Sequence, residues 1–269
     1  MEHSNIFIFG DSHSKCFVRP DYILKYNNIL LYNLYKSSST MIGLNKFNNS
    51  KLKYGTEIEK FVSKINKNDF ILFMSGHVDI HYNLIYKKLI LKKEIIFEEF
   101  IKDIIQSFIT FINNLKKYTK NIIICGAVPC VEQNNVYKYY YFQKPYNINI
   151  IPEWFEYQKQ FLRTILFNKE LKNISIKNSL IYIDYINETC NKLKGIWSVK
   201  DEFVCHDEHF KGAETHIMKY PLSHSEKLNT LFIKKLYNTL SDINSDKINK
   251  DKNKNKDKNE NKIIYIVKK

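Results

Sequence analysis

Short apolar runs alternate with segments of helical periodicity along most of this chain, and this alternation restricts the possible folds more than any other feature. Apolar or β-branched residues dominate five runs that we predict to be strands: Ile6–Phe9, Asn28–Tyr35, Asp69–Met74, Asn121–Cys125 and Leu180–Tyr185. Apolar residues recur at helical spacing in four more segments: Thr56–Ile65, Glu94–Tyr118, Pro152–Leu171 and Ser225–Leu240. This order predicts an α/β fold with a mostly parallel sheet covered by helices on both faces.

The domain organisation follows from length and from the composition of the C-terminal end. With 269 residues the chain is long enough for one sizeable α/β domain, which we place at residues 1–240. The stretch Ser241–Lys262 consists almost entirely of Lys, Asn and Asp, so we expect residues 241–269 to be a disordered tail. Within it, Ile263–Val267 is apolar again, which allows either an edge strand or a frayed end.

The formal net charge of +14 makes a nucleic-acid partner the first possibility to examine. Nearly all basic residues are Lys, and the only Arg are Arg19 and Arg163. Because Arg is the usual residue for base edges and bidentate phosphate contacts, we expect a Lys-rich solvated surface and no specific nucleic-acid binding.

The cysteines and the apolar runs indicate the compartment. The five cysteines form no CxxC pair, which favours free thiols in a reducing compartment. No signal-peptide layout precedes the first apolar strand, and no apolar run reaches the ~20 residues of a membrane helix. We therefore expect a cytoplasmic protein without a membrane partner. The sequence gives no indication of an oligomeric state.

The first motif with chemical content is Gly10-Asp11-Ser12-His13-Ser14, directly after the first predicted strand. A Ser in the turn from a buried strand into a helix lies at the edge of the sheet, close to helical N–H groups that stabilise negative charge. This is the layout of a nucleophilic Ser. The alternative is structural, because Asp11 or Ser12 can equally serve as the N-cap of the helix.

The second motif is Cys205-His206-Asp207-Glu208-His209, which precedes the last predicted helix. A nucleophilic Ser needs a His base, and the His needs a group that orients its ring. In an extended segment the side chains of Asp207 and His209 point to the same side, so Asp207 can hold Nδ1 of His209. A His-rich surface loop, or a metal site that also includes His216, are the alternatives.

The third motif is Ser75-Gly76-His77-Val78-Asp79, after the third predicted strand. Gly at the end of a strand allows close approach of another backbone, and Asp79 is able to cap a helix or bind a neighbouring loop. An active-site role and a plain structural turn both remain open for this motif.

The three motifs in this order resemble the blocks of the SGNH (GDSL-type) hydrolase superfamily, closest to a branch with GDSHS and GEID blocks. The resemblance covers Ile6 to Leu240. It implies a flavodoxin-like three-layer α/β/α sandwich and acyl-ester chemistry without a metal or organic cofactor. By position, Ser12 corresponds to the nucleophile, His209 to the base and Asp207 to the orienting acid. Gly76, His77 and Asp79 correspond to the oxyanion and substrate-binding block.

Two departures from the family pattern concern the oxyanion hole and the acid. The family usually spaces Asp and His three apart, whereas here they are two apart. The family's Asn donor corresponds to Val78, and His77 is a possible substitute donor. The second donor belongs to the loop after the second strand, where Ser38, Ser39 and Gly43 are candidates. We choose Gly43 because it has no side chain to obstruct approach.

These observations predict a serine-dependent esterase that acts on O-acyl esters, with carbohydrate acetyl esters as the favoured substrates. The Tyr- and Asn-rich stretch from Val131 to Ile151 has no clear period and suits an insertion over the active site, where Tyr rings can contact sugars. Two alternatives stay open: an acyltransferase to sugars that uses the same Ser-His-Asp residues, and a non-catalytic glycan-binding protein on the same fold.

Overall fold

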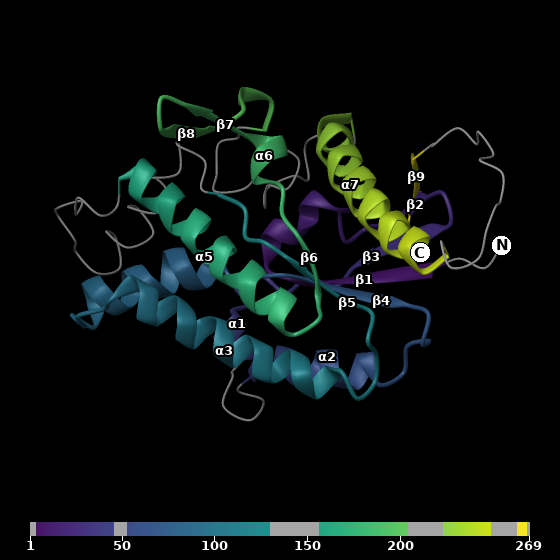
Figure 1. Cartoon of the computed structure of the whole chain (residues 1–269), viewed down its shortest axis with the longest axis horizontal. Helices are drawn as coiled ribbons and strands as arrows, with labels where there is room; N and C mark the ends of the chain where they lie inside the picture. The colour runs from purple at the N-terminus through teal and green to yellow at the C-terminus, as the bar shows by residue number, and fades with distance from the viewer. Residues whose placement is uncertain (1–3, 46–52, 130–155, 204–222, 249–262, 268–269) are drawn as a thin grey trace.

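A seven-stranded sheet of order β6-β5-β4-β1-β3-β2-β9 forms the centre of the molecule (Figure 1). The computed structural model describes residues 4–45, 53–129, 156–203, 223–248 and 263–267. The strands are β1 (Ser4–Gly10), β2 (Tyr22–Tyr26), β3 (Ile29–Asn33), β4 (Phe70–Met74), β5 (Ile122–Cys125), β6 (Ile181–Ile183) and β9 (Ile263–Val267).

The pairing of these strands confirms the predicted mostly parallel sheet. Strands β6, β5, β4, β1 and β3 are mutually parallel, whereas β2 runs antiparallel to β3 and β9 antiparallel to β2. Counted along the chain, the five parallel strands have the order 2-1-3-4-5, which is the flavodoxin-like doubly wound arrangement. In this arrangement ligands bind beyond the carboxyl ends of the strands.

Helices cover both faces of the sheet, as Figure 1 shows with α3 on one side and α7 on the other. The α-helices are α1 (Met41–Asn45), α2 (Tyr54–Val62), α3 (Phe97–Leu115), α5 (Tyr157–Lys177), α6 (Ile186–Thr189) and α7 (Ser223–Ile248). The 3₁₀ helices are η1 (Ser12–Cys16) and η5 (Asp201–Phe203), and the π-helical turns are η2 (Val78–Asn83) and η3 (Tyr86–Ile90). Among the described residues, no helix is both long and apolar enough to cross a membrane.

The strands are apolar on both faces because each face packs against its own helical layer. Ile8 of β1 lies in one buried cluster with Phe232 of α7, whereas the next residue, Phe9, lies in the other with Phe108 of α3. Successive strand residues point to opposite faces, so only a continuous apolar run can fill both layers. This explains why the five parallel strands are recognisable in the sequence.

Three strands were absent from the sequence prediction. Strand β2 is short and alternates buried and half-exposed residues. Strands β7 (Cys190–Leu193) and β8 (Ile196–Val199) form a separate hairpin, and β7 exposes Asn191, Lys192 and Leu193. None of these segments has the continuous apolar run on which the prediction depended, because β2 is only partly buried on one face and β7 is mostly exposed.

The C-terminal end differs from the boundary that we placed at residue 240. Helix α7 continues to Ile248, and Ile263–Val267 forms strand β9, paired in register with β2 from Tyr22↔Val267 to Tyr26↔Ile263. The edge-strand alternative is therefore the one observed, and the sheet includes residues beyond the predicted boundary. Most of the Lys-rich stretch lies outside the described residues, so its disorder stays a prediction.

Candidate active site

The loops after four parallel strands meet at the carboxyl edge of the sheet. Gly10 and Met74 are register partners at the ends of β1 and β4, so the first and third motifs begin side by side. The Lys36 N–H, after β3, donates to the Gly10 carbonyl oxygen at 2.9 Å. Nδ1 of His77 lies 3.1 Å from the carbonyl oxygen of Val128, after β5. Residues distant in the chain are thus brought together where the fold class predicts a ligand site.

Two glycines make this convergence possible. A Cβ on Gly10 would lie 1.9 Å from the Met74 carbonyl oxygen, so no other residue fits between the two strand ends. Gly76 has a φ of 113° and a Cβ there would lie 2.5 Å from Cζ of Phe167. The left-handed backbone and the Phe167 ring both require Gly at this turn.

Ser12 is the first residue of η1, and Asp11 is the N-cap of this helix. The Asp11 side chain accepts the His13 backbone N–H at 2.9 Å, and its Oδ1 also lies 2.9 Å from Nδ1 of His13. The N-cap alternative is therefore correct for Asp11, while Ser12 occupies the strand-to-helix turn expected of a nucleophile. Ser12 is 7% exposed, which places it within the body of the site.

A second set of bonds fixes the rest of η1 against β3. The Ser14 hydroxyl lies 2.8 Å from the Asp11 carbonyl oxygen and 3.2 Å from Oδ1 of Asn33. Nδ2 of Asn33 in turn donates to the Val18 carbonyl oxygen at 2.8 Å. Because all four residues are buried, these bonds hold the Ser12 turn in one conformation.

Three buried histidine rings contact one another in series, beginning with His13, the neighbour of Ser12 in the chain. The ring centroids of His13 and His77 are 3.8 Å apart, and those of His77 and His81 are 4.5 Å apart. Nε2 of His81 lies 3.1 Å from the Thr164 hydroxyl of α5. Since the Val128 carbonyl only accepts hydrogen bonds, it fixes the proton of a neutral His77 on Nδ1. Nε2 of His77 is then an acceptor, so this geometry does not support the expected oxyanion donor.

Asp79, in the third motif, is a fully buried carboxyl group. Its Oδ2 accepts the Met41 N–H at 2.8 Å, and Oδ1 lies 3.4 Å from Nδ2 of Asn83. Burial is the main reason why the pKa of Asp79 rises to about 7, and the charge of Asp11 raises it further, whereas hydrogen bonds from the Met41 N–H, the Ile42 N–H and the Asn83 side chain lower it. Asp79 therefore ties the third motif to the start of α1.

The loop after β3 differs from the expectation for the second oxyanion donor. The Gly43 N–H donates to the Thr40 hydroxyl at 2.9 Å inside the first turn of α1, so this group is already engaged. Ser38 adopts a left-handed backbone with φ of 59°. Ser39 is 2% exposed, and its hydroxyl has no hydrogen-bond partner among the described residues. Ser39 is thus the better donor candidate in this loop.

The predicted base and its alternatives lie outside the described residues. This holds for Asp207 and His209, for the other histidines of that region, and for the Tyr-rich stretch between 131 and 151. The segment that contains Asp207 and His209 follows Phe203, which is buried in η5, and ends at the start of α7. Within the described part of the chain, no group of three or more His, Cys, Asp or Glu side chains is arranged to hold a metal ion.

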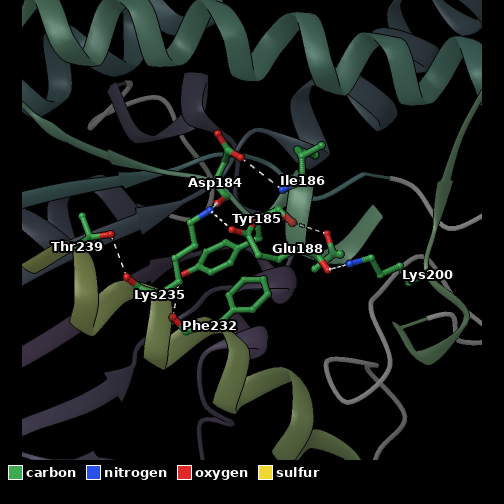
Figure 2. A network of polar contacts seen from close by, with 9 residues as sticks. Asp184, Tyr185, Ile186, Glu188, Lys200, Phe232, Lys235 and Thr239 are labelled. Carbon is green, nitrogen blue, oxygen red and sulfur yellow. Dashed lines mark hydrogen bonds and ion pairs between the residues drawn. The ribbon is translucent and has the colours of Figure 1, made fainter. Parts of the chain in front are cut away.

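Helix α7 is anchored at the end of β6 by a polar network that the sequence analysis did not find (Figure 2). Nζ of Lys235 donates to the Asp184 carbonyl oxygen and to Oε1 of Glu188, the latter at 2.6 Å. The Tyr185 hydroxyl donates to the Phe232 carbonyl oxygen at 2.9 Å, and their rings stack at 3.6 Å. A single Lys in a Lys-rich helix carries no sequence signal for such a contact.

Similarity of this chain to known proteins is found at the level of three-dimensional structure. No protein-family model and no curated protein matches this chain. Solved structures do, and two of them have TM-scores of 0.49.

One is an acylhydrolase, described as putative, from Bacteroides fragilis (10% identity, 88% of each chain covered). Another is a GDSL-like lipase from Bacteroides thetaiotaomicron (8% identity, 87% of this chain and 88% of the other). A third is a catalytic mutant of an acetylxylan esterase from Geobacillus stearothermophilus (TM-score 0.45, 12% identity, 87% and 94% covered). At such identities and TM-scores, the similarities carry no information about the reaction of this chain.

Proposed function

We propose that this protein is a serine esterase of the SGNH type, in which Ser12 attacks the carbonyl carbon of an O-acyl ester. The observation that carries the proposal is the meeting of the first and third motifs at the carboxyl edge of the sheet, where the His13 and His77 rings are in contact. Ser12 occupies the turn from β1 into η1, the position in which a Ser hydroxyl can reach a ligand at this edge.

In this proposal His209 accepts the Ser12 proton while the seryl oxygen bonds to the carbonyl carbon, and Asp207 orients the His209 ring. The tetrahedral intermediate collapses when His209 returns the proton to the leaving alcohol. Water then attacks the acyl-enzyme with His209 as the base, and the free acid leaves as the seryl oxygen regains its proton. The reaction balances without a metal or organic cofactor.

The oxyanion requires donors close to Ser12, and the chain offers them from two elements. The Ser12 N–H is the first. The loop after β3 is the second, because its Lys36 is hydrogen-bonded to Gly10 and it carries the buried hydroxyl of Ser39. Gly43, whose N–H is engaged by Thr40, is the weaker candidate. Each donor lost from such a site costs about 3 kcal/mol of transition-state stabilisation.

The substrate class is inferred from the position of the Tyr-rich stretch. This stretch follows β5, whose continuation at Val128 contacts His77 in the site. Tyr side chains combine a flat apolar ring with a hydroxyl, a combination that suits sugar rings. We therefore favour an acetylated carbohydrate as the substrate, with hydrolysis as the reaction.

The nucleophile is tested by labelling with a fluorophosphonate probe followed by mass spectrometry. We expect the label on Ser12 in the wild type and no label in Ser12→Ala. Ser14→Ala is the matched control, because it removes a neighbouring hydroxyl that bonds to Asn33 but leaves Ser12 in place. Because the Ser14 bonds hold the Ser12 turn, Ser14→Ala should be labelled more slowly but still at Ser12. A label on another residue would remove the esterase proposal.

The base and the reaction type are tested on an aryl acetate and on acetylated sugars. His209→Ala should abolish turnover, and Asp207→Asn should reduce it less. A requirement for His206 or His216 in place of His209 would show that the base is misassigned. Free acid as the only product supports hydrolysis, acylated sugar indicates transfer, and sugar binding that survives Ser12→Ala without turnover indicates a binding protein.

A further inference from the structure

Asn229 connects the helix that begins with Ser12 to α7 through a buried carboxamide. Its side chain is fully buried, and Nδ2 donates to the Cys16 carbonyl oxygen at 2.7 Å, with the Lys15 carbonyl oxygen at 3.4 Å. Both carbonyls belong to the end of η1, where a helix leaves carbonyl groups without an intrahelical partner. The carboxamide therefore caps the far end of η1 from a helix 213 residues away in the chain.

The third partner of the carboxamide is Tyr265 of β9. Its hydroxyl donates to Oδ1 of Asn229 at 3.2 Å, and its ring lies edge-on to Tyr22 of β2 at 6.1 Å. Both ends of the Asn229 amide are thus used, by η1 on one side and by the C-terminal edge strand on the other. One side chain joins three segments that are far apart in the sequence.

The surroundings of this link are apolar. The apolar cluster that joins η1 to α7 includes the fully buried Phe17 and Phe232 and the 1% exposed Leu228. A displacement of α7 along η1 would separate the Asn229 donors from the carbonyls and leave buried polar groups unpaired. Lys235 holds the same helix at a second point, the end of β6. Helix α7 therefore has a fixed position relative to η1.

We infer that Asn229 is a positioning residue, which sets the distance between the Ser12 helix and α7, the helix that follows the segment with the predicted base. The inference rests on the proposed function. Ser12 lies one turn from the carbonyls that Asn229 binds, and α7 begins six residues before Asn229. The other end of η1 is fixed independently by Asp11 and Asn33. Only the relation to α7 depends on Asn229.

This role predicts a loss in kcat with little change in KM. A misplacement of about 1 Å between catalytic groups can lower a rate by about 100-fold, whereas substrate contacts away from the interface of η1 and α7 are unaffected. For Asn229→Ala we expect kcat to fall about 10- to 100-fold, with KM within about twofold of the wild type. Tyr265→Phe removes one of the three bonds, so its kcat should fall only about two- to fivefold.

The experiment compares Asn229→Ala with Leu240→Ala in the full-length chain. Leu240 is a buried α7 residue in the same apolar cluster, about 16 Å farther along the helix. Each variant is assayed for kcat and KM on an aryl acetate, for fluorophosphonate labelling rate, and for amide hydrogen exchange over residues 12–18. We expect Leu240→Ala to lower the melting temperature but to retain kcat, and only Asn229→Ala to accelerate exchange in η1.

The outcomes separate this inference from the proposed function. If the wild type is labelled at Ser12 but Asn229→Ala loses only thermal stability, as Leu240→Ala does, the positioning role is wrong and the esterase proposal stands. If the wild type is not labelled at Ser12, both fall together. If Asn229→Ala does not fold, Tyr265→Phe decides: unchanged kcat together with unchanged exchange in η1 overturns the inference.

Discussion

Replacement of Asp79 by Asn should make the protein more stable at alkaline pH, although it removes a buried hydrogen-bonded carboxylate. The Asp79 side chain is fully buried and accepts the Met41 N–H at 2.8 Å. An Asn at this position keeps an oxygen acceptor for Met41 and cannot ionise. The substitution loses the 3.4 Å hydrogen bond from Nδ2 of Asn83 to Oδ1, because the amide nitrogen that replaces Oδ1 cannot accept a hydrogen bond.

The magnitude follows from the pKa of Asp79, which burial raises from 3.8 to about 7. The folded protein therefore holds this proton more tightly than the unfolded chain does. The resulting stability is fully present below about pH 4 and is lost as the pH rises through about 7. A difference of about three in pKa corresponds to about 4 kcal/mol in the free energy of unfolding. The Asn83 contact contributes about 1 kcal/mol in the opposite direction at every pH.

The assay is urea unfolding of wild type and Asp79→Asn at several pH values between 4 and 8. The difference between the two free energies of unfolding should change in favour of the variant by about 4 kcal/mol over this range. Other titrating groups cancel in this difference. Asn83→Ala, which keeps the carboxyl group, should retain the pH dependence of the wild type, slightly enlarged because the Asn83 bond lowers the pKa of Asp79. A difference that changes by less than about 1 kcal/mol would refute the assignment of a raised pKa to Asp79.

Three further substitutions or deletions test other parts of the structure by unfolding measurements. Gly76→Ala should lower the free energy of unfolding by about 3 kcal/mol, because the new Cβ would clash with the Phe167 ring. Gly195→Ala is the control: Gly195 has a φ of 85° but nothing within 4 Å, so the loss should be only about 1 kcal/mol. Equal losses would contradict the steric explanation. Deletion of residues 263–269 should lower the free energy of unfolding by about 2–3 kcal/mol, since it removes the pairing of β9 with β2 and the partly buried side chains of β9. An unchanged melting temperature would show that β9 adds nothing to stability. Lys235→Met should lower the free energy of unfolding by about 1–2 kcal/mol, because the bonds of Lys235 at the end of β6 are lost. An unchanged free energy would mean that the Lys235 bonds in Figure 2 do not contribute to stability.

The sequence predicted the central elements of the fold because their signal is local. Strands β3, β4, β5 and β6 fall within the predicted runs, β1 contains its predicted run, and α2, α3 and α7 overlap the predicted helical segments. A strand buried on both faces must be apolar throughout, and a helix on a sheet must be apolar on one side. The secondary structure of each such segment can therefore be predicted from its own residues. Helix α5 overlaps the predicted segment Pro152–Leu171 and continues to Lys177, while Pro152 lies outside the described residues.

The site was predictable only in part. The position of Ser12 follows from a strand, a Gly and a helix in sequence, and the structure places it in that turn. The roles expected for Gly43 and His77 do not agree with their bonds, because the Gly43 N–H binds Thr40 and Nδ1 of His77 lies against the Val128 carbonyl. Each of these partners became visible only in three dimensions.

What the sequence by itself determined about this protein is therefore the parallel strands, the longer helices, the glycines at the ends of β1 and β4 and the residue types available at the strand ends. Only the tertiary structure decided which of these residues touch. The contact of His13 with His77, the cap of η1 by Asn229 and the pairing of β9 with β2 join residues that are remote in the chain. Periodicity and capping are short-range properties, whereas a buried polar side chain takes whichever partner the packing of the whole domain brings within hydrogen-bond distance.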